Sequence, residues 1–383
     1  MSSDQLSGDN VKFRGRLGLQ QRVLPAYRVP FFDLLAQSCQ GGMSLFAGMP
    51  RAEEGITSAE LLRIPYCVTA KNWHLFRGAY YLCYQQGMVD WLEKTKPDAL
   101  IMEATPRYLA TTPAVKWMHA RERKVIGWGL GAPPLPPTHL PLGDGLRSRA
   151  WGQFLSQFDA LIAYSQRGVD EYASLGFPRQ KIFVAHNSVS SASTFNVQRS
   201  TLNACPERSR RVQPCILFVG RLQARKRVDW LLRACAEMES KPRLVIVGDG
   251  PERAALESLA REAYPSAEFI GSKHGAELKP FFAQADLFVL PGTGGLAVQE
   301  AMAHGLPVIV AKGDGTQDDL VRAGNGWQIP PDDFDALVAA MKNALSDSMR
   351  LRKMGAESYR IVLEEINIGK MVSMFVRVLN ELT

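Results

Sequence analysis

Residues 290–310 read LPGTGGLAVQEAMAHGLPVIV, a glycine-rich stretch between two apolar runs. The run ADLFVL at 285–290 and the run LPVIV at 306–310 are typical of buried parallel strands, and VQEAMAHG between them favours a helix that ends at a glycine. A glycine-rich turn from a strand into a helix presents backbone N–H groups to a ligand. For this stretch taken alone, the alternative is an ordinary turn whose glycines only allow tight packing.

The same alternation of strand and helix runs through residues 214–365. The predicted strands are 215–220, 243–248, 267–271, 285–290, 306–310 and 327–330. The predicted helices are 227–238, 251–263, 276–285, 317–324 and 332–347. Short apolar runs that alternate with helical stretches indicate βα units around a parallel sheet.

Residues 11–190 repeat this theme more loosely. The predicted strands are 43–48, 97–103, 124–129, 159–165 and 181–187, and the predicted helices are 31–38, 80–95 and 169–176. Residues 132–150 are rich in proline and predict a loop, and the polar residues 191–213 predict a linker between two domains. Residues 366–383 have apolar side chains at helical spacing, and we expect them to form a helix that packs on a core.

The composition excludes several classes of protein. The chain has 383 residues, which suits two domains, and no run of eighteen apolar residues that would predict a transmembrane helix. The first sixteen residues have no apolar core, so we expect no secretory signal. The six cysteines are scattered without a CxxC pair, which predicts a reduced, cytoplasmic protein without a zinc site.

The net charge of +7 belongs mostly to the first half of the chain. Residues 1–190 contain 21 Lys and Arg against 15 Asp and Glu, whereas residues 191–383 contain 24 against 23. The basic first half suits an anionic partner, such as a phosphate-bearing substrate or an acidic membrane surface, and an ordinary solvated surface is the alternative. The pattern contains no nucleic-acid-binding module.

Five stretches of the second half form a recognisable set: FVGRLQARK (218–226), VIVGDGPER (245–253), FFAQADLFVLPG (281–292), GGLAVQEAMAHGLPVIV (294–310) and GNGWQIPPDD (324–333). Together they resemble glycosyltransferase family 4, whose members are retaining enzymes of the GT-B fold. The resemblance implies an α/β fold with two Rossmann-like domains that face a central cleft. It also implies that the C-terminal helix crosses back to the N-terminal domain. We therefore expect an acceptor domain at 11–190 with 366–383, and a nucleotide-sugar donor domain at 214–365.

The resemblance assigns a donor site to the second half. Glu300 is expected to accept charge-assisted hydrogen bonds from two ribose hydroxyls. Arg221 and Lys226 are expected to stabilise the charge that grows on the leaving diphosphate, which makes them the catalytic residues. The other expected donor contacts are Gly220, Thr293, Gly294, Gly295 and Leu296. The resemblance implies no metal ion, because the pair of fixed cations stabilises the diphosphate, and no cofactor, because the nucleotide-sugar is a substrate.

Each of these assignments has a structural alternative. Glu300 alone is also a helix N-terminal glutamate favoured by the helix dipole. Arg221 and Lys226 also read as part of a solvated basic run.

The sequence departs from the family at two places. The family usually has a second glutamate eight positions before Glu300, where this chain has Gly292. We expect backbone N–H groups or Thr293 to contact the donor sugar instead. The alternative is that the enzyme has weak or no activity. The histidine that often follows the strand at 124–129 is also missing. On the acceptor side the candidates are therefore Tyr27, Arg28, Trp128 and His139, each of which also reads as packing or as an exposed side chain. No catalytic base is assigned.

The expected function is the retaining transfer of a sugar from a UDP- or GDP-sugar to a glycan or lipid-linked glycan, as in bacterial surface polysaccharide synthesis. The basic first half suits work at the inner face of the cytoplasmic membrane. Two alternatives stay open: a catalytically silent GT-B protein that binds a nucleotide, and a GT-B sugar-nucleotide epimerase. A nicotinamide-dependent oxidoreductase is disfavoured, because no GxGxxG motif follows the first strand.

Overall fold

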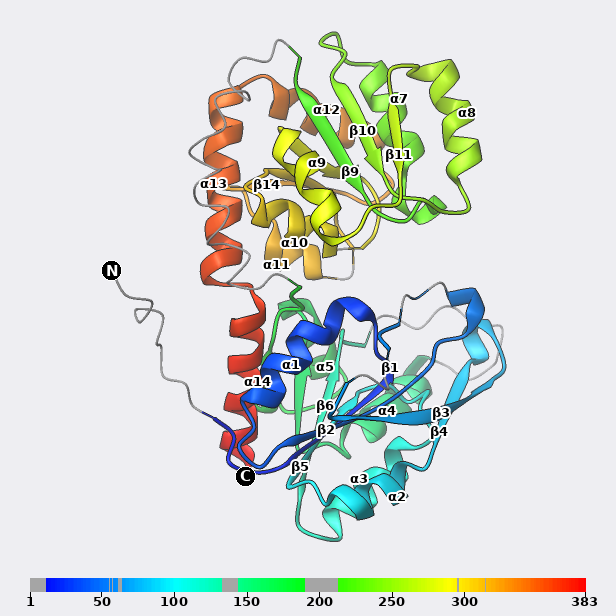
Figure 1. The fold of residues 1–383 in the computed structure, drawn as a ribbon, viewed down its shortest axis with the longest axis vertical. Helices are drawn as coiled ribbons and strands as arrows, with labels where there is room; N and C mark the ends of the chain where they lie inside the picture. The colour runs from blue at the N-terminus through cyan, green and yellow to red at the C-terminus, as the bar shows by residue number, and fades with distance from the viewer. Residues whose placement is uncertain are drawn as a thin grey trace. The chain divides into compact units, whose positions relative to one another are not determined.

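The computed structural model describes residues 12–54, 56, 58–60, 64–132, 144–189, 213–294, 296–313 and 315–383. The chain divides into two compact units, Met1–Asn187 with Ile368–Thr383, and Ser188–Asn367 (Figure 1). Ser188 and Val189 belong to the second unit, whereas the sequence suggested the first, because both donate hydrogen bonds to the Gln299 side chain, at 3.1 and 2.8 Å. Of the predicted linker, residues 191–212 lie outside the described residues.

The first unit is built on an eight-stranded sheet with the order β4-β3-β2-β1-β5-β6-β7-β8. All neighbouring strands are parallel except β3 and β4, which form an antiparallel hairpin at one edge. The strands are β1 Leu17–Val23, β2 Met43–Gly48, β3 Cys67–Leu75, β4 Leu82–Gln86, β5 Ala99–Glu103, β6 Lys124–Gly129, β7 Ala160–Ala163 and β8 Ile182–Val184.

Helices cover both faces of this sheet, which explains its nearly continuous apolar strands. The helices are α1 Val29–Gln37, α2 Met88–Thr95, α3 Thr111–His119, α4 Asp144–Leu155, α5 Gln166–Ser174 and α14 Ile368–Leu382. Alternate residues of one strand point into two separate cores: Ile101 of β5 packs in the core that contains α1 and α14, and Leu100 packs in the core that contains α2 and α3.

Two sequence-based assignments in the first unit are wrong. The predicted helix 80–95 is a 3₁₀ turn, the strand β4 and then the shorter helix α2, because Gly87 has a φ of +85° and ends the strand there. The predicted loop 132–150 ends earlier, since α4 begins at Asp144. Trp151, Phe154 and Leu155 are spaced three and four residues apart, so they lie on one face of α4. That face packs against the core and stabilises the helix.

The second unit is a six-stranded parallel sheet with the order β11-β10-β9-β12-β13-β14. Its strands are β9 Cys215–Val219, β10 Arg243–Val247, β11 Glu268–Gly271, β12 Leu287–Leu290, β13 Val308–Ala311 and β14 Gly326–Ile329. Its helices are α7 Val228–Ala236, α8 Arg253–Ala263, α9 Lys279–Gln284, α10 Leu296–Ala303, α11 Thr316–Leu320, α12 Phe334–Leu345 and α13 Ser348–Glu364. Each strand predicted in this half is present, with its bounds shifted by two residues or fewer. The α/β prediction is confirmed.

The last helix returns to the first unit, as predicted. Met371, Phe375 and Leu379 of α14 are buried in the core that contains α1. This contact buries the apolar face of α14. Within the described ranges, no helix combines the length and the apolarity needed to cross a membrane.

Candidate active site

The donor residues predicted from the sequence gather at the carboxyl ends of β9 and β12, which are neighbours in the second sheet. Gly220 and Arg221 follow β9 directly, and Lys226 ends a short 3₁₀ turn, Ala224–Lys226. Thr293 and Gly294 follow β12, and Leu296 is the first residue of α10. Gly295 lies outside the described residues. The carboxyl ends of parallel strands are where open α/β sheets bind ligands.

Hydrogen bonds join the segments that follow the two strands. Thr293 N donates to the Arg225 carbonyl at 3.0 Å, and Lys226 Nζ donates to the Thr293 carbonyl at 2.5 Å. The Arg225 guanidinium donates to Thr293 Oγ1 at 3.3 Å. Because its N–H and carbonyl are both bonded to the 225–226 segment, Thr293 offers a sugar only its side chain. The N–H groups expected to face the donor therefore belong to the residues that follow Thr293.

Both glycines beside Thr293 lie against this segment. A Cβ atom on Gly292 would lie 2.1 Å from the Arg225 carbonyl oxygen and 2.6 Å from Lys226 Cα. A Cβ atom on Gly294 would lie 2.1 Å from Lys226 Nζ, and the φ of Gly294 is +112°, in the region that favours glycine. The backbone of residues 225–226 therefore fills the space where a side chain at position 292 would begin.

This contact predicts that Gly292→Ala lowers the free energy of unfolding by about 1–3 kcal/mol, the usual cost of overpacking. Gly292→Glu is expected to cost more and to weaken nucleotide binding, because the backbone must move. Urea denaturation measures the first effect. Gly145→Ala is the control, since a Cβ there meets open space inside α4. A Gly292→Glu variant that keeps wild-type stability and turns over donor faster would contradict this account.

Glu300 lies in the second turn of α10, whose first turn contains no acidic residue. Burial alone raises the pKa of its carboxyl to about 7. The effect of a helix dipole falls off within the first turn, so the position of Glu300 argues against that explanation. Burial removes water that would otherwise hydrogen-bond to the ionised carboxylate. A ligand whose hydroxyls donate hydrogen bonds to Glu300 would replace that water.

The sequence did not single out Arg225. Arg225 contacts Thr293, and with Arg227 and Lys312 it lines a cavity of about 350 Å³ beside Gly292. Arg227 is held by an ion pair with Asp332. The sequence signal was the matched stretch 218–226 itself, which contains Arg225 between the two residues that were chosen.

In the first unit the structure brings together three of the four acceptor-side candidates. Arg28 stacks over the rings of Trp128, Tyr164 and Tyr27, at 4.9, 5.3 and 5.8 Å from the ring centroids, and donates to the Tyr164 hydroxyl at 3.0 Å. Tyr27 is exposed. Tyr27 and Arg28 follow the carboxyl end of β1, and Trp128 lies near the carboxyl end of β6, on the ligand-binding edge of the same sheet. His139 lies outside the described residues.

The assignment of Trp128 to the acceptor side is corrected. Its indole is 1 % exposed and packs against Phe31, Phe32 and Phe375, with ring centroids 5.0 to 6.3 Å apart. Trp128 therefore supports Arg28 from beneath and has no face left for a ligand.

Glu103, at the carboxyl end of β5, is a second residue that the sequence did not single out. Its side chain accepts a hydrogen bond from Arg22 N at 2.5 Å, and burial raises the pKa of its carboxyl against the opposing effect of that bond. The Arg22 side chain in turn pairs with Glu54 at 2.9 Å. The sequence feature that could have identified Glu103 is its position directly after the apolar run ALIM. A carboxyl group in such a place suits the binding of acceptor hydroxyls.

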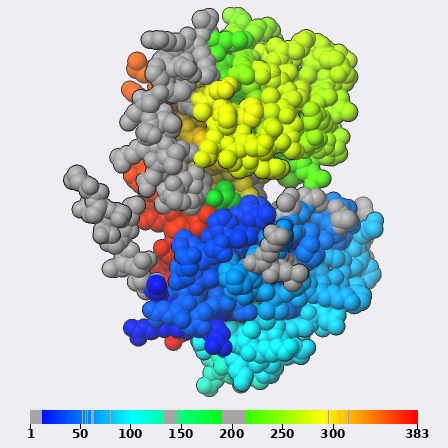
Figure 2. Space-filling view, in the orientation of Figure 1, coloured from blue at the N-terminus to red at the C-terminus, as the bar shows by residue number. Residues whose placement is uncertain are grey.

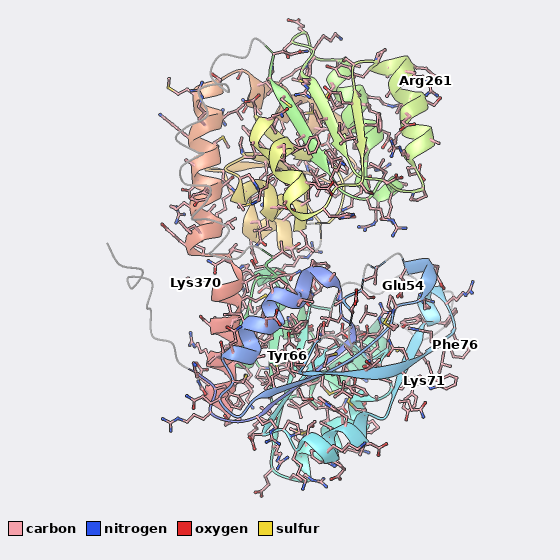
Figure 3. The ribbon with its side chains drawn as sticks, in the orientation of Figure 1. Glu54, Tyr66, Lys71, Phe76, Arg261 and Lys370 are labelled. Atoms are coloured by element: carbon pink, nitrogen blue, oxygen red, sulfur yellow. The ribbon has the colours of Figure 1, made fainter. Side chains whose placement is uncertain are left out.

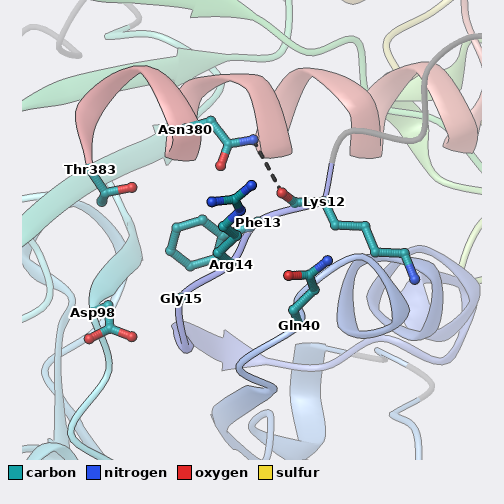
Figure 4. A pocket seen from close by; sticks show the side chains of 8 residues that line it. All are labelled: Lys12, Phe13, Arg14, Gly15, Gln40, Asp98, Asn380 and Thr383. Atoms are coloured by element: carbon teal, nitrogen blue, oxygen red, sulfur yellow. Dashed lines mark hydrogen bonds between the residues drawn. The ribbon is translucent and has the colours of Figure 1, made fainter.

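A larger cavity, of about 670 Å³, lies at the opposite edge of the first sheet (Figure 4). Its lining includes Gly15 before β1 and Asp98 before β5, with Asn380 of α14 donating to the Lys12 carbonyl at 3.5 Å. The amino ends of parallel strands do not form the ligand crevice of such folds, so we do not assign the cavity to the active site. Among the described residues, no group of three or more His, Cys, Asp and Glu side chains is placed to hold a metal ion.

The chain is similar to known glycosyltransferases. Residues 213–347 match the family model described as glycosyl transferases group 1. A GDP-mannose-dependent alpha-mannosyltransferase of Mycobacterium tuberculosis is 35% identical over 195 residues, which are 49% of this chain and 48% of that protein. The lipopolysaccharide core biosynthesis glycosyltransferase LpsE of Rhizobium meliloti is 26% identical over 62% of this chain and 71% of its own length. The chain thus spans about half the length of the first of these relatives.

A solved structure shares the fold over 95% of the chain. The crystal structure of Anabaena HepE in complex with UDP and glucose has a TM-score of 0.66 and 17% identity, over 95% of this chain and 99% of HepE. At this identity the likeness concerns the fold. Residues 213–347 therefore match the model of the glycosyl transferases group 1 family, and the chain has the two α/β domains of the GT-B fold.

Proposed function

We propose that the chain is a retaining glycosyltransferase that moves a hexose from a UDP- or GDP-sugar to a glycan or lipid-linked glycan, without a metal ion. The observation that carries the proposal is the arrangement at the carboxyl edge of the second sheet. There the cations of residues 225 and 226 bond the turn before α10, and Glu300 lies in that helix as a half-buried carboxylate.

In this proposal Glu300 holds the ribose and the N-terminus of α10 faces the diphosphate. Arg221 and Lys226 stabilise the diphosphate as the sugar leaves. The acceptor binds at the carboxyl edge of the first sheet, near Tyr27, Arg28 and Glu103. The named relatives support this reading, since one uses GDP-mannose and HepE binds UDP.

Isothermal titration with UDP and with GDP, in buffer with EDTA, tests the donor site. We expect one nucleotide to bind the wild-type chain and Glu300→Ala to lose that binding. Glu262→Ala, an exposed glutamate on α8, is the matched control and is expected to bind as the wild type does. Nucleotide binding without sugar transfer would identify a silent GT-B protein, and binding of neither nucleotide would contradict the proposal.

A further inference from the structure

The β3–β4 hairpin of the first unit has its polar face inside and its apolar face outside. Asn72 and Gln85 are paired across the hairpin, and their side chains are hydrogen-bonded to each other at 3.0 Å. Both also donate to β1, Asn72 to the Arg22 carbonyl at 2.8 Å and Gln85 to the Gln21 carbonyl at 3.1 Å. These two amides tie the hairpin to the sheet, and His74 and Cys83 share their inward face.

The outward face of the hairpin is apolar and aromatic. Trp73 stands opposite Tyr84, and Leu75 stands opposite Leu82. Trp73 is 47 % exposed, and both Leu75 and Tyr84 are exposed as well. An antiparallel hairpin with one solvated face normally has its polar residues on that face, so the arrangement is the reverse of the usual one.

The tip of the hairpin continues this surface. Phe76 is 69 % exposed and Tyr80 is 62 % exposed. Phe76 also has a φ of +58°, a left-handed conformation that is costly for an aromatic residue. Figure 3 shows Phe76 and Lys71 at the outer rim of the first unit, and Figure 2 shows this light-blue part of the chain on the surface. Exposed apolar side chains gathered on one hairpin in this way mark an interaction site.

The charges around the hairpin are positive. From Cys67 to Gln86 the hairpin contains Lys71 and Arg77 and no acidic residue. Lys71 Nζ lies 4.2 Å from the centroid of the Trp73 ring.

The acidic and titratable groups near the hairpin do not cancel these charges. Glu54 is neutralised by ion pairs with Arg22 and Arg51, at 2.9 and 3.3 Å. His74 faces inward and its ring bonds the Tyr81 hydroxyl at 2.9 Å; burial and Arg22 lower its pKa, so it adds no positive charge at neutral pH. The exposed patch is thus aromatic with a cationic margin.

We propose that the outward face and tip of the β3–β4 hairpin dock on an anionic lipid bilayer. Trp and Tyr are the side chains that prefer the membrane–water interface, Phe and Leu add apolar surface that enters the acyl boundary, and Lys71 and Arg77 bind anionic headgroups. The amphipathic helix α14 does not compete for this role, because its apolar face is buried. A second copy of the chain fits less well, since two such cationic margins repel each other.

Co-sedimentation of the full chain with vesicles tests the proposal. The vesicles contain phosphatidylcholine with 40 mol% phosphatidylglycerol, beside pure phosphatidylcholine as the uncharged comparison. We expect the wild-type chain to bind the anionic vesicles. The triple variant Trp73→Ser, Phe76→Ser, Tyr80→Ser is expected to lose at least about tenfold in affinity for them. Lys71→Gln with Arg77→Gln is expected to remove most of the preference for anionic lipid. Met349→Ser, an equally exposed apolar residue of the second unit, is the control.

Three outcomes would overturn the proposal. They are a wild-type chain that ignores anionic vesicles, a triple variant that binds them as tightly as the wild type, and a wild-type dimer that the triple variant dissociates in light scattering. Thermal melting checks that the variants fold, which their exposed positions lead us to expect. The binding assay needs no nucleotide and no turnover, so its failure is distinguishable from failure of the proposed transferase function.

Discussion

Lys226→Ala is expected to lower kcat for sugar transfer about 100- to 1000-fold while changing the Kd of the nucleotide-sugar less than about tenfold. The cation stabilises negative charge that grows on the diphosphate as the bond to the sugar breaks, so its removal affects the transition state more than the bound substrate. The side chain of Lys226 reaches the turn before α10, where its Nζ donates to the Thr293 carbonyl. This position brings the ammonium group to the end of the helix expected to face the diphosphate.

Turnover is measured as release of the nucleotide diphosphate from the donor that the titration selects. Lys353→Ala, an exposed lysine of α13, is the matched control and is expected to leave kcat unchanged. Arg225→Ala distinguishes the role of Arg225 from that of Lys226, since Arg225 also contacts Thr293. If Arg225→Ala lowered kcat more than Lys226→Ala, the catalytic role would belong to Arg225.

The sheet of the second unit was predictable from the sequence because its strands are short apolar runs closed by glycine or proline. Residues 215–219 and 287–290 are fully buried, so periodicity was not needed to find them. The donor turn was predictable for the same reason, since it connects two such runs. The contact between Gly292 and Arg225 was not, because it joins residues that only the pairing of β9 with β12 brings together.

The first unit was harder to predict because its pattern misleads. In β3 the alternation of Lys71, Trp73 and Leu75 with Asn72 and His74 would place the aromatic side inside, whereas the amides are inside. Hydrogen bonds to the β1 backbone decide the orientation, and hydropathy contains no signal for them. Trp128 illustrates the same limit, since Phe375 of the last helix covers its ring.

Glu300 predicts a pH-dependent donor affinity. The pKa of its carboxyl is about 7 in the free protein, and hydrogen bonds from two ribose hydroxyls favour the ionised form, so binding of the donor lowers that pKa. Below pH 7 the carboxyl must lose a proton before it binds, and the Kd of the nucleotide-sugar is expected to rise about tenfold between pH 8 and pH 6. A nucleotide-sugar is the right probe, because its diphosphate is esterified at both ends and does not titrate in this range.

The variant Glu300→Gln separates this effect from any other titration. At pH 8 it is expected to bind the donor about 100-fold more weakly, since charge-assisted bonds contribute about 1.5–3 kcal/mol each, and its Kd should not change with pH. A Kd of the variant that still rises tenfold by pH 6 would assign the pH dependence to another group.

The stability of Glu300→Gln should change in the opposite direction. Because burial raises the pKa of Glu300 above its value of 4.5 in the unfolded chain, the wild type loses stability as the pH rises from 4.5 through 7. Glutamine has no such charge, so the variant is expected to have a higher Tm than the wild type at pH 8 and a similar Tm near pH 4.5. A variant that binds the donor more weakly at pH 8 yet melts at a higher temperature cannot owe its weaker binding to damaged folding. That combination would establish Glu300 as a carboxylate kept at a cost to stability because the nucleotide requires it.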